Sequence, residues 1–175
     1  MQKMVSDLLD FNSFAANAIP VNKKPIYIGE SLKEMVYQWN LIQDNVPIEV
    51  TIDKPDEDIE IYTDVLRLQQ ILLNLLNNAR QAIQGKGKIT ITICLADAHW
   101  VAIDIQDNGP GIPAAEQDLI FERFYRGEEK KYKVRGLGLG LPFSKMLARA
   151  MGGDLKLKES SQDGTIFTIT LPFDD

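Results

Sequence analysis

A long amphipathic segment constrains the fold of this chain most. Between residues 68 and 83, apolar side chains recur at about 100° per residue and share one helical face. They are Leu68, Ile71, Leu72, Leu75, Leu76, Ala79 and Ile83. Such a face must be buried against another layer, so the segment predicts a core helix. Thr63 or Asp64 can cap its start, and Gly85 and Gly87 are expected to end it.

The layer that covers this helix is predicted to be a sheet. Residues 88–95 and 100–106 alternate apolar and polar side chains, as half-buried strands do. Further strands are predicted over residues 47–53, 58–62, 154–159 and 165–172, and further helices over 31–43 and 139–151. The chain has 175 residues, of which 45% are apolar and 25% charged, and this fits one globular domain. We therefore expect a mixed α/β domain with helices packed on a sheet.

Composition excludes several kinds of site. The 19 basic and 25 acidic residues give a net charge of −6. This charge argues against binding of nucleic acid through an overall positive charge. Cys94 is the single cysteine and His99 the single histidine, so an intrachain disulfide, a cysteine-rich zinc site and a multi-histidine metal site are excluded. The sequence contains no membrane-length apolar run and no signal peptide. We expect a cytoplasmic location, with any membrane anchor carried by a longer parent protein.

The first residues are predicted to form a helix that is separate from the main domain. Residues 1–19 carry apolar side chains on more than one side of that helix. Two interpretations stay open: the helix needs a partner, such as a second copy of itself, or it packs on its own domain. Pro20 and Pro25 bracket a linker over residues 20–25, and the main domain follows over residues 26–175.

Two asparagines lie at the edge of the long helix. Asn74 and Asn78 are four residues apart and therefore stack on one line beside the apolar face. Their side-chain oxygens can point into a cleft next to the helix. A hard cation such as Mg²⁺ takes oxygen ligands, and one or two amide oxygens with phosphate oxygens would suffice. Taken alone, such a pair more often lies on a solvated helix edge.

A glycine-bearing loop follows the strand predicted over residues 100–106. Asp107 comes first, and then Gly109 and Gly111 with a proline between them. Glycines let the backbone turn sharply and let a planar ligand approach closely. A carboxylate at this place can accept a hydrogen bond from an exocyclic amine. A tight turn that begins with an aspartate explains the same residues.

A second glycine-rich segment precedes the helix predicted over residues 139–151. It consists of Gly136, Leu137, Gly138, Leu139, Gly140 and Leu141. Backbone N–H groups at a helix start can hold an anion, so we favour a phosphate site over a flexible hinge. The segment matches neither the dinucleotide-binding fingerprint nor a Walker P-loop. Residues 107–138 are predicted to be mostly irregular, and so long a loop is usually functional or mobile.

Five segments occur in a set order along the chain: QQILLNLLNNA, DNGPGI, FERFYRG, GLGLGL and DGTIFTITLP. In this order and spacing they closely resemble the ATP-binding catalytic domain of two-component sensor histidine kinases, in the GHKL ATPase superfamily. The segments match the family's N, G1, F, G2 and G3 boxes, and the resemblance covers residues 25–173. It implies the Bergerat fold, which is a two-layer α/β sandwich whose mixed sheet carries helices on one face.

The resemblance implies an adenine site. Asp107 matches the carboxylate that reads the adenine amine, and Thr165 matches a position near the adenine. Gly109 and Gly111 match the glycines beside the base, and Ile112, which follows them, is expected to contact the nucleotide.

The resemblance also implies a phosphate and metal site. Asn74 and Asn78 match the asparagines that bind Mg²⁺ and the phosphates, and residues 136–141 match the glycine segment that wraps the phosphates. Residues 112–135 match the ATP lid. Its matching side chains are the F-box aromatics Phe121 and Phe124 and the cations Arg126, Lys130, Lys131 and Arg135. Asn74, Asn78 and Arg126 are expected to carry the chemistry.

The chain departs from the family pattern in two ways. Gln81 stands where many members carry a lysine, and Leu137 stands where threonine is frequent. The family's phospho-accepting histidine lies in a helical hairpin before this domain, whereas His99 lies between two predicted strands and is expected to be a turn or strand-end residue. Residues 1–19 resemble the end of that hairpin's second helix, so the acceptor is absent from this chain.

The function implied is transfer of the ATP γ-phosphoryl group to a histidine of a dimerisation domain, for relay to a response regulator receiver domain by a homodimeric parent. Hydrolases and serine kinases of the superfamily carry a glutamate four residues before the Mg²⁺-binding asparagine, where this chain has Asn74. The sequence therefore favours a histidine kinase. The alternative is a nucleotide-gated interaction module, or a degenerate kinase, that binds ATP and transfers nothing.

Overall fold

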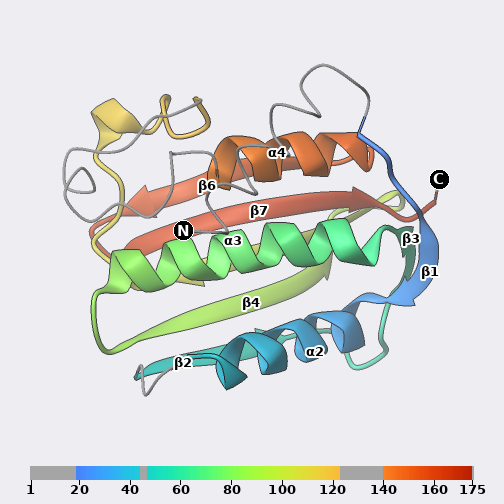
Figure 1. The fold of residues 1–175 in the computed structure, drawn as a ribbon, viewed down its shortest axis with the longest axis horizontal. Helices are drawn as coiled ribbons and strands as arrows, with labels where there is room; N and C mark the ends of the chain where they lie inside the picture. The colour runs from blue at the N-terminus through green and yellow to red at the C-terminus, as the bar shows by residue number, and fades with distance from the viewer. Residues whose placement is uncertain (1–18, 44–46, 123–139, 175) are drawn as a thin grey trace.

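Three helices cover one face of a mixed sheet in the part of the chain that the computed structural model describes, residues 19–43, 47–122 and 140–174 (Figure 1). The helices are α2 (Ile28–Leu41), α3 (Val65–Ile83) and α4 (Gly140–Ala150). The strands are β1 (Lys24–Tyr27), β2 (Ile48–Asp53), β3 (Glu60–Thr63), β4 (Gly87–Leu95), β5 (Trp100–Asp107), β6 (Asp154–Ser161) and β7 (Gly164–Pro172). A short 3-10 helix covers Ala114–Glu116. This arrangement confirms the predicted two-layer α/β sandwich.

The five-stranded sheet has the strand order β2-β4-β5-β7-β6. β2 and β4 are parallel, because β3 and the crossover helix α3 separate them in the chain. The other three pairings are antiparallel: the hairpins β4–β5 and β6–β7, and the β5–β7 junction that joins them. β1 and β3 form a separate antiparallel pair.

Alternation along β5 divides the sheet into a buried face and an open face. Val101 and Ile103 are fully buried in the core beneath the helices, as the pattern over residues 100–106 predicts. On the open face, Asp104 accepts hydrogen bonds from Thr168 (Oγ1, 2.7 Å) and from Lys158 (Nζ, 2.8 Å). Polar cross-strand contacts therefore occupy the side of the sheet that the helices leave uncovered.

Helix α3 begins as predicted and ends differently. The carboxylate of Asp64 is its N-cap and accepts hydrogen bonds from the backbone N–H groups of Leu66 (3.1 Å) and Arg67 (3.3 Å). The same carboxylate accepts a hydrogen bond from the Asn22 N–H at 2.8 Å, which fixes the segment before β1 to the start of α3. At the other end, Gln84 rather than a glycine takes the left-handed C-cap conformation, at φ 54°.

Other boundaries shift by a few residues. α2 begins at Ile28 rather than at residue 31, because the Asp58 carboxylate caps it from a distant part of the chain. It accepts hydrogen bonds from two backbone N–H groups of the first turn, at 2.7 and 3.0 Å. β1 begins at Lys24, within the segment expected to be a linker. Gly87 is the first residue of β4 and does not end α3.

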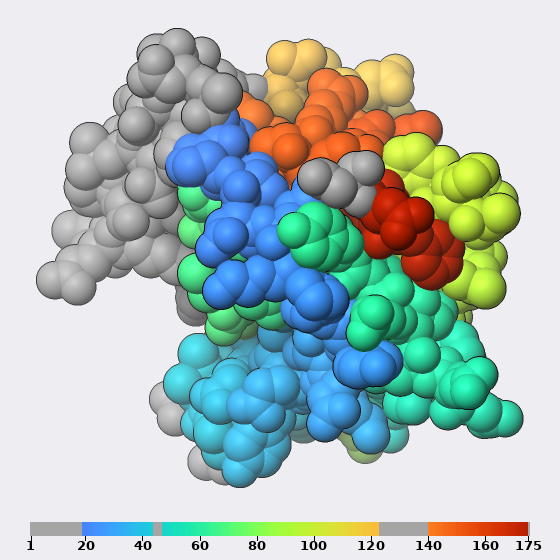
Figure 2. Space-filling view, turned by 90° about the vertical axis from the view of Figure 1, so that its right-hand side faces the viewer, coloured from blue at the N-terminus to red at the C-terminus, as the bar shows by residue number. Residues whose placement is uncertain are grey.

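The two ends of the five-stranded sheet differ in what surrounds them. At one end, β5 finishes at Asp107 opposite Thr165 of β7. At the other end, β5 begins at Trp100 opposite Pro172, and the residue after β7 accepts a backbone hydrogen bond from β3 at 2.9 Å. Figure 2 views the molecule from this second end, where β1, β3 and the last residues of the chain come together.

Candidate functional site

Polar side chains end the buried rows of two neighbouring strands. In β5 the buried row continues to Asp107, whose exposed fraction is 5%, and in β7 it begins at Thr165, whose exposed fraction is 4%. These two residues are direct cross-strand partners, so their side chains share the helix-covered face. A carboxylate and a hydroxyl thus stand where the rest of the row has core side chains. Because burying polar groups is costly, both residues have hydrogen-bond partners: Gly109 for Asp107 and Ser160 for Thr165.

The loop after β5 is held close to this pair by two glycines. Asp107 Oδ1 accepts a hydrogen bond from the Gly109 N–H at 2.9 Å. A Cβ atom on Gly109 would lie 3.2 Å from the carbonyl carbon and oxygen of Ala82 in α3, so a glycine lets the loop pack against the helix. Gly111 has φ +86°, a conformation that favours glycine. A Cβ atom there would collide with the backbone carbonyl of Ser161.

One line of α3 connects this loop to α4. Asn74, Asn78 and Ala82 are spaced four residues apart and therefore lie on one edge of the helix. At one end of the line, Ala82 meets the loop after β5. At the other end, Asn74 Nδ2 donates hydrogen bonds to Ser144 Oγ (3.0 Å) and to the Gly140 carbonyl (3.5 Å) in the first turns of α4. Asn78 lies between these two contacts and is half-buried.

Polar contacts on both sides fix how α3 is rotated. Ser144, which receives the Asn74 hydrogen bond, is fully buried. On the α2 side, Trp39 Nε1 donates a hydrogen bond of 2.9 Å to Asn77 Oδ1, and Trp39 is itself only 1% exposed. Because the Asn74 amide nitrogen is engaged with α4, a cation would have to use the oxygen of that amide. The position of Asn78 follows from these neighbouring contacts.

Phe121, an expected F-box aromatic, is held by β7 and α4. Its ring packs edge-on against Phe167, with 6.2 Å between the ring centroids, and Lys145 Nζ lies 4.7 Å from its centroid. Lys145 also donates a hydrogen bond to the Leu155 carbonyl (2.6 Å) and lies 3.1 Å from Asp154 Oδ1. Burial by itself would raise the pKa of the Asp154 carboxyl, but the Lys145 and Leu155 hydrogen bonds lower that pKa below its ordinary value of 3.8. Lys145 could not be predicted from the sequence, because a single lysine in a helix has no local signal.

Ser160 is a further residue of this region that the sequence does not predict. Its Oγ accepts a hydrogen bond from the Ile112 N–H at 2.8 Å and shares another of 2.9 Å with Thr165 Oγ1. The serine thus joins two of the expected nucleotide-contacting residues, one on the loop after β5 and one on β7.

Several expected site residues lie outside the described residues: Phe124, Arg126, Lys130, Lys131, Arg135, Gly136, Leu137, Gly138 and Leu139. Gly140 is the first residue of α4, and Leu141 follows it and packs against the core. His99 lies in the turn between β4 and β5, as predicted.

Two features are absent from the described ranges 19–43, 47–122 and 140–174. No group of three or more histidine, cysteine, aspartate or glutamate residues there could hold a metal ion. None of the helices there has both the length and the hydropathy of a membrane span.

The family model described as "Histidine kinase-, DNA gyrase B-, and HSP90-like ATPase" matches residues 63–175 of this chain. The adaptive-response sensory kinase SasA of Prochlorococcus marinus (strain MIT 9313) is 28% identical over 172 residues, which is 98% of this chain and 46% of that protein. The sensor histidine kinase WalK of Bacillus subtilis (strain 168) is 29% identical over 175 residues, covering 99% of this chain and 28% of that protein. The chain therefore spans less than half the length of these relatives.

Solved structures show the same fold. Full-length ShkA in complex with AMPPNP superimposes with a TM-score of 0.85 at 29% identity, covering 98% of this chain and 35% of that one. The nucleotide-free catalytic domain of the histidine kinase ThkA gives a TM-score of 0.73 at 24% identity, covering 88% of this chain and 99% of that one. With the family match over residues 63–175, these likenesses show that the chain belongs to the ATPase family of histidine kinases, DNA gyrase B and HSP90, as the ATPase domain of a sensor histidine kinase.

Proposed function

We propose that this domain transfers the γ-phosphoryl group of ATP to a histidine in a separate helical dimerisation domain. One observation carries the proposal: α3 places Asn78 between the start of α4 and the loop beside the buried Asp107. The two sides of this region offer different chemistry. The Asp107 side suits a nucleobase, and the α4 side suits phosphate groups.

The Asp107 side supports adenine recognition. The buried carboxylate can accept a hydrogen bond from the exocyclic amine of the base, and the Thr165 hydroxyl lies beside it in the same row. Gly109 and Gly111 leave backbone rather than side chains in the loop that follows this carboxylate. The relative ShkA, which has the same fold, was solved with the ATP analogue AMPPNP.

The α4 side supports phosphate and Mg²⁺ binding. Backbone N–H groups at a helix start and the helix dipole favour an anion, and Gly140 begins α4 at this place. The side-chain oxygens of Asn78 and Asn74, together with phosphate oxygens, fit the ligand preference of Mg²⁺. Bound there, Mg²⁺ would neutralise charge on the phosphates during transfer. The lid cation Arg126 is proposed to add positive charge.

The residues at hand favour transfer to histidine over hydrolysis. Position 74, where hydrolases of the superfamily carry a water-activating glutamate, is an asparagine whose Nδ2 donates to Ser144. A neutral imidazole is already a nucleophile, so this domain does not have to supply a general base. Positioning and charge neutralisation then account for most of the catalysis.

The proposed partners follow from the resemblance of residues 1–19 to a dimerisation helix. Residues 1–19 are proposed to be the end of a dimerisation hairpin, so the longer parent would act as a homodimer in the cytoplasm. A response regulator receiver domain would then take the phosphoryl group from the histidine. The structural relative ThkA has been solved in complex with the response regulator TrrA.

Calorimetric titration with ATP and ADP in the presence of Mg²⁺ tests the nucleotide site. Asp107→Asn is expected to weaken both nucleotides equally, by about ten- to a hundredfold, because both carry the same base and the variant loses a charged hydrogen-bond acceptor. Asp104→Asn is the matched control on the open face of the same strand and should bind like the parent chain. Weakening of ATP alone would instead assign Asp107 to the phosphates.

A second assay tests the transfer step. The chain is incubated with radiolabelled ATP and a separately supplied hairpin domain that carries the acceptor histidine. Acid-labile label on the hairpin supports the kinase. Normal ATP binding with no transfer would favour the nucleotide-gated interaction module.

A further inference from the structure

A hydroxyl bridge ties the adenine side of the site together. Ser160 Oγ lies 2.8 Å from the Ile112 backbone nitrogen and 2.9 Å from Thr165 Oγ1. Thr165 is in turn the direct strand partner of Asp107. Three neighbouring strands, β6, β7 and β5, therefore present a serine, a threonine and an aspartate in one row across the sheet.

A β-bulge in β6 places a serine opposite Thr165. Leu157 pairs with Phe167, but the next pair is Glu159 with Ile166, so Lys158 is an extra residue in the strand. The shift brings Ser160 opposite Thr165. Had the pairing continued without this extra residue, Glu159 would stand opposite Thr165, in the same row as Asp107. The bulge therefore keeps a second carboxylate out of the row and supplies a hydroxyl instead.

We infer that Ser160 is a positioning residue of the adenine subsite, which it serves by holding the Thr165 hydroxyl and the Ile112 amide at fixed places around the base. The inference rests on the proposed nucleotide binding and deepens it. Ser160 need not touch the nucleotide, because it acts through Thr165 on the strand and through the Gly111–Ile112 backbone on the loop.

The hydrogen-bond capacity of a serine suits this bridge. A hydroxyl can accept from an N–H group and still exchange one hydrogen bond with a second hydroxyl, in which either oxygen can donate. Alanine at position 160 would leave the Thr165 hydroxyl, in a residue only 4% exposed, without this partner. The loop would also lose the hydrogen bond that fixes Ile112 relative to β6. Both losses fall on the side of the site that reads the base.

The test is a double-mutant cycle with Ser160→Ala and Thr165→Val, followed by binding of ATP, ADP and GTP. Ser161→Ala is the matched control, because its Oγ accepts a hydrogen bond from the Asp163 N–H within the hairpin turn. Ser160→Ala is expected to weaken ATP and ADP equally, by about tenfold, and to weaken GTP less, so the preference for adenine falls. In the Thr165→Val background, the same change should cost less than about twofold, because the two hydroxyls act as one unit.

Three outcomes would overturn the inference. Equal weakening of ATP and GTP by Ser160→Ala would show a general packing role. Additive effects in the cycle would show that the serine does not act through Thr165, and an equal loss in Ser161→Ala would show that the hairpin as a whole matters. Thermal unfolding of each variant identifies any that fails to fold, and Thr165→Val reports on the same bridge from its other side.

The proposed nucleotide site is judged separately in the same titrations. If the parent chain binds ATP and Asp107→Asn weakens it while Ser160→Ala binds normally, the inference about Ser160 fails and the proposed function stands. If the parent chain binds no nucleotide at millimolar concentration, both fail.

Discussion

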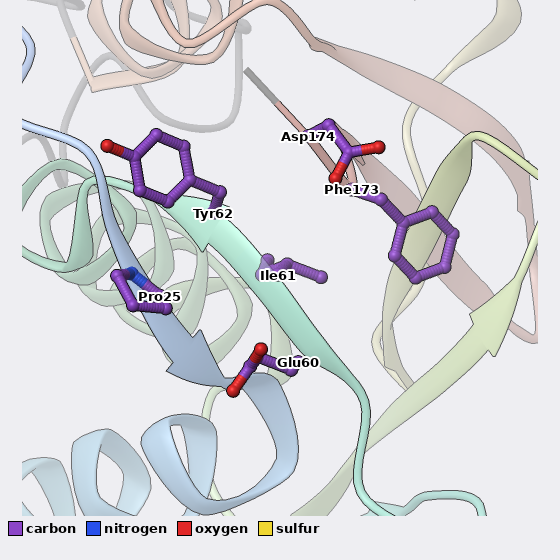
Figure 3. Close-up of a pocket in the computed structure, with 6 residues that line it drawn as sticks. All are labelled: Pro25, Glu60, Ile61, Tyr62, Phe173 and Asp174. Atoms are coloured by element: carbon purple, nitrogen blue, oxygen red, sulfur yellow. The ribbon is translucent and has the colours of Figure 1, made fainter.

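The two ends of the five-stranded sheet carry different kinds of surface. At the Asp107 end, buried polar side chains continue rows that are apolar elsewhere. At the opposite end, backbone hydrogen bonds join Phe173 to Tyr62 (2.9 Å) and to His99 (3.1 Å). Beside them lies an open pocket of about 260 Å³ lined by Pro25, Glu60, Ile61, Tyr62, Phe173 and Asp174 (Figure 3).

The pocket and the buried polar pair lie at opposite ends of the sheet, and of the two only the polar pair belongs to the expected nucleotide site. The pocket at the β1–β3 end is lined by short-strand and terminal residues and lies at the other end of β5 from Asp107. The Asp107 end instead brings together residues from β5, β6, β7, α3 and the loop after β5. Substitutions that act on one end only can test this division.

The largest expected effect comes from a pair of glycines, one at each end. Gly164 has φ +138°, and a Cβ there would collide with the Asp107 carbonyl; a Cβ on Gly153 would collide with the Thr170 carbonyl. Either change to alanine should lower the free energy of unfolding by about 3 kcal/mol, measured by urea titration. Gly164→Ala should also weaken ATP at least about tenfold, because it displaces the Asp107 backbone.

Gly153→Ala is the control for that experiment, because it places a comparable collision at the far end of β7. Its folded fraction should bind ATP with the affinity of the parent chain. If Gly164→Ala also binds normally, the proposed adenine site does not depend on the β5–β7 junction, and the difference drawn between the two ends is wrong.

The second largest effect is expected at Lys145. Its ammonium group contacts the Phe121 ring, in the segment after β5, and the Asp154 carboxylate at the start of β6. Lys145→Met should lower the free energy of unfolding by about 2 kcal/mol, since a partly buried charged hydrogen bond is lost. The pKa of Asp154 should rise, because this lysine helps to hold it below 3.8. NMR titration of the Asp154 carboxyl measures that shift directly.

The sign of the pH dependence follows from the lowered pKa. The stabilisation from Asp154 is complete above the unfolded value and is lost as the pH falls through the lower folded value. In Lys145→Met this acid-side loss should shrink. An Asp154 pKa that stays unchanged would contradict the assigned contact. Arg149→Met, at the more exposed partner of the same carboxylate, is the control and should have a smaller effect.

A third, smaller effect belongs to the β1–β3 end. Burial raises the pKa of the Asp58 carboxyl, but backbone hydrogen bonds from Gly29, Glu30 and Ile59 outweigh it and lower that pKa below 3.8. Asp58→Asn should therefore cost about 1 kcal/mol of unfolding free energy above pH 4 and less as the pH falls through the folded value. ATP affinity should not change. An affinity loss would mean that the two ends are coupled.

The smallest expected effect lies on the open face. Lys158 is 56% exposed and pairs with Asp104 at 2.8 Å. Lys158→Met should change the free energy of unfolding by less than about 0.5 kcal/mol, because exposed ion pairs contribute little. Urea titration at low and high salt checks this. A larger loss that does not depend on salt would show that the bulge at this residue, rather than its charge, had been disturbed.

The predictable parts of the fold are those dictated by burial along the chain. The apolar face of α3 and the alternation in β4 and β5 follow from neighbouring residues, and the structure confirms them. The start of α2 could not be predicted, because its cap is Asp58, which is distant in sequence. β1 was also missed: it has four residues, includes Pro25 and pairs with a strand far along the chain.

The site, like the fold, contains residues that the sequence predicts and residues that it does not. Asp107, Gly109 and Thr165 belong to motifs with a local pattern, and the structure brings them to one end of the sheet. Their roles toward a nucleotide remain predictions. Ser160 and Lys145 could not be found from the sequence, because each acts through partners that only the folded chain brings close. The bulge that places Ser160 also depends on pairing with β7 and has no signal in β6 alone.

The pairing of Asp107 with Thr165 has a consequence for how the sheet assembles and comes apart. β4–β5 and β6–β7 are hairpins of neighbouring segments, whereas the β5–β7 junction closes a long intervening stretch of chain. Non-local pairings of this kind form slowly, after the hairpins. A ligand held by both residues can bind only once the junction exists. Bound nucleotide should therefore slow unfolding while leaving the folding rate nearly unchanged, so that occupancy sets the lifetime of the native sheet.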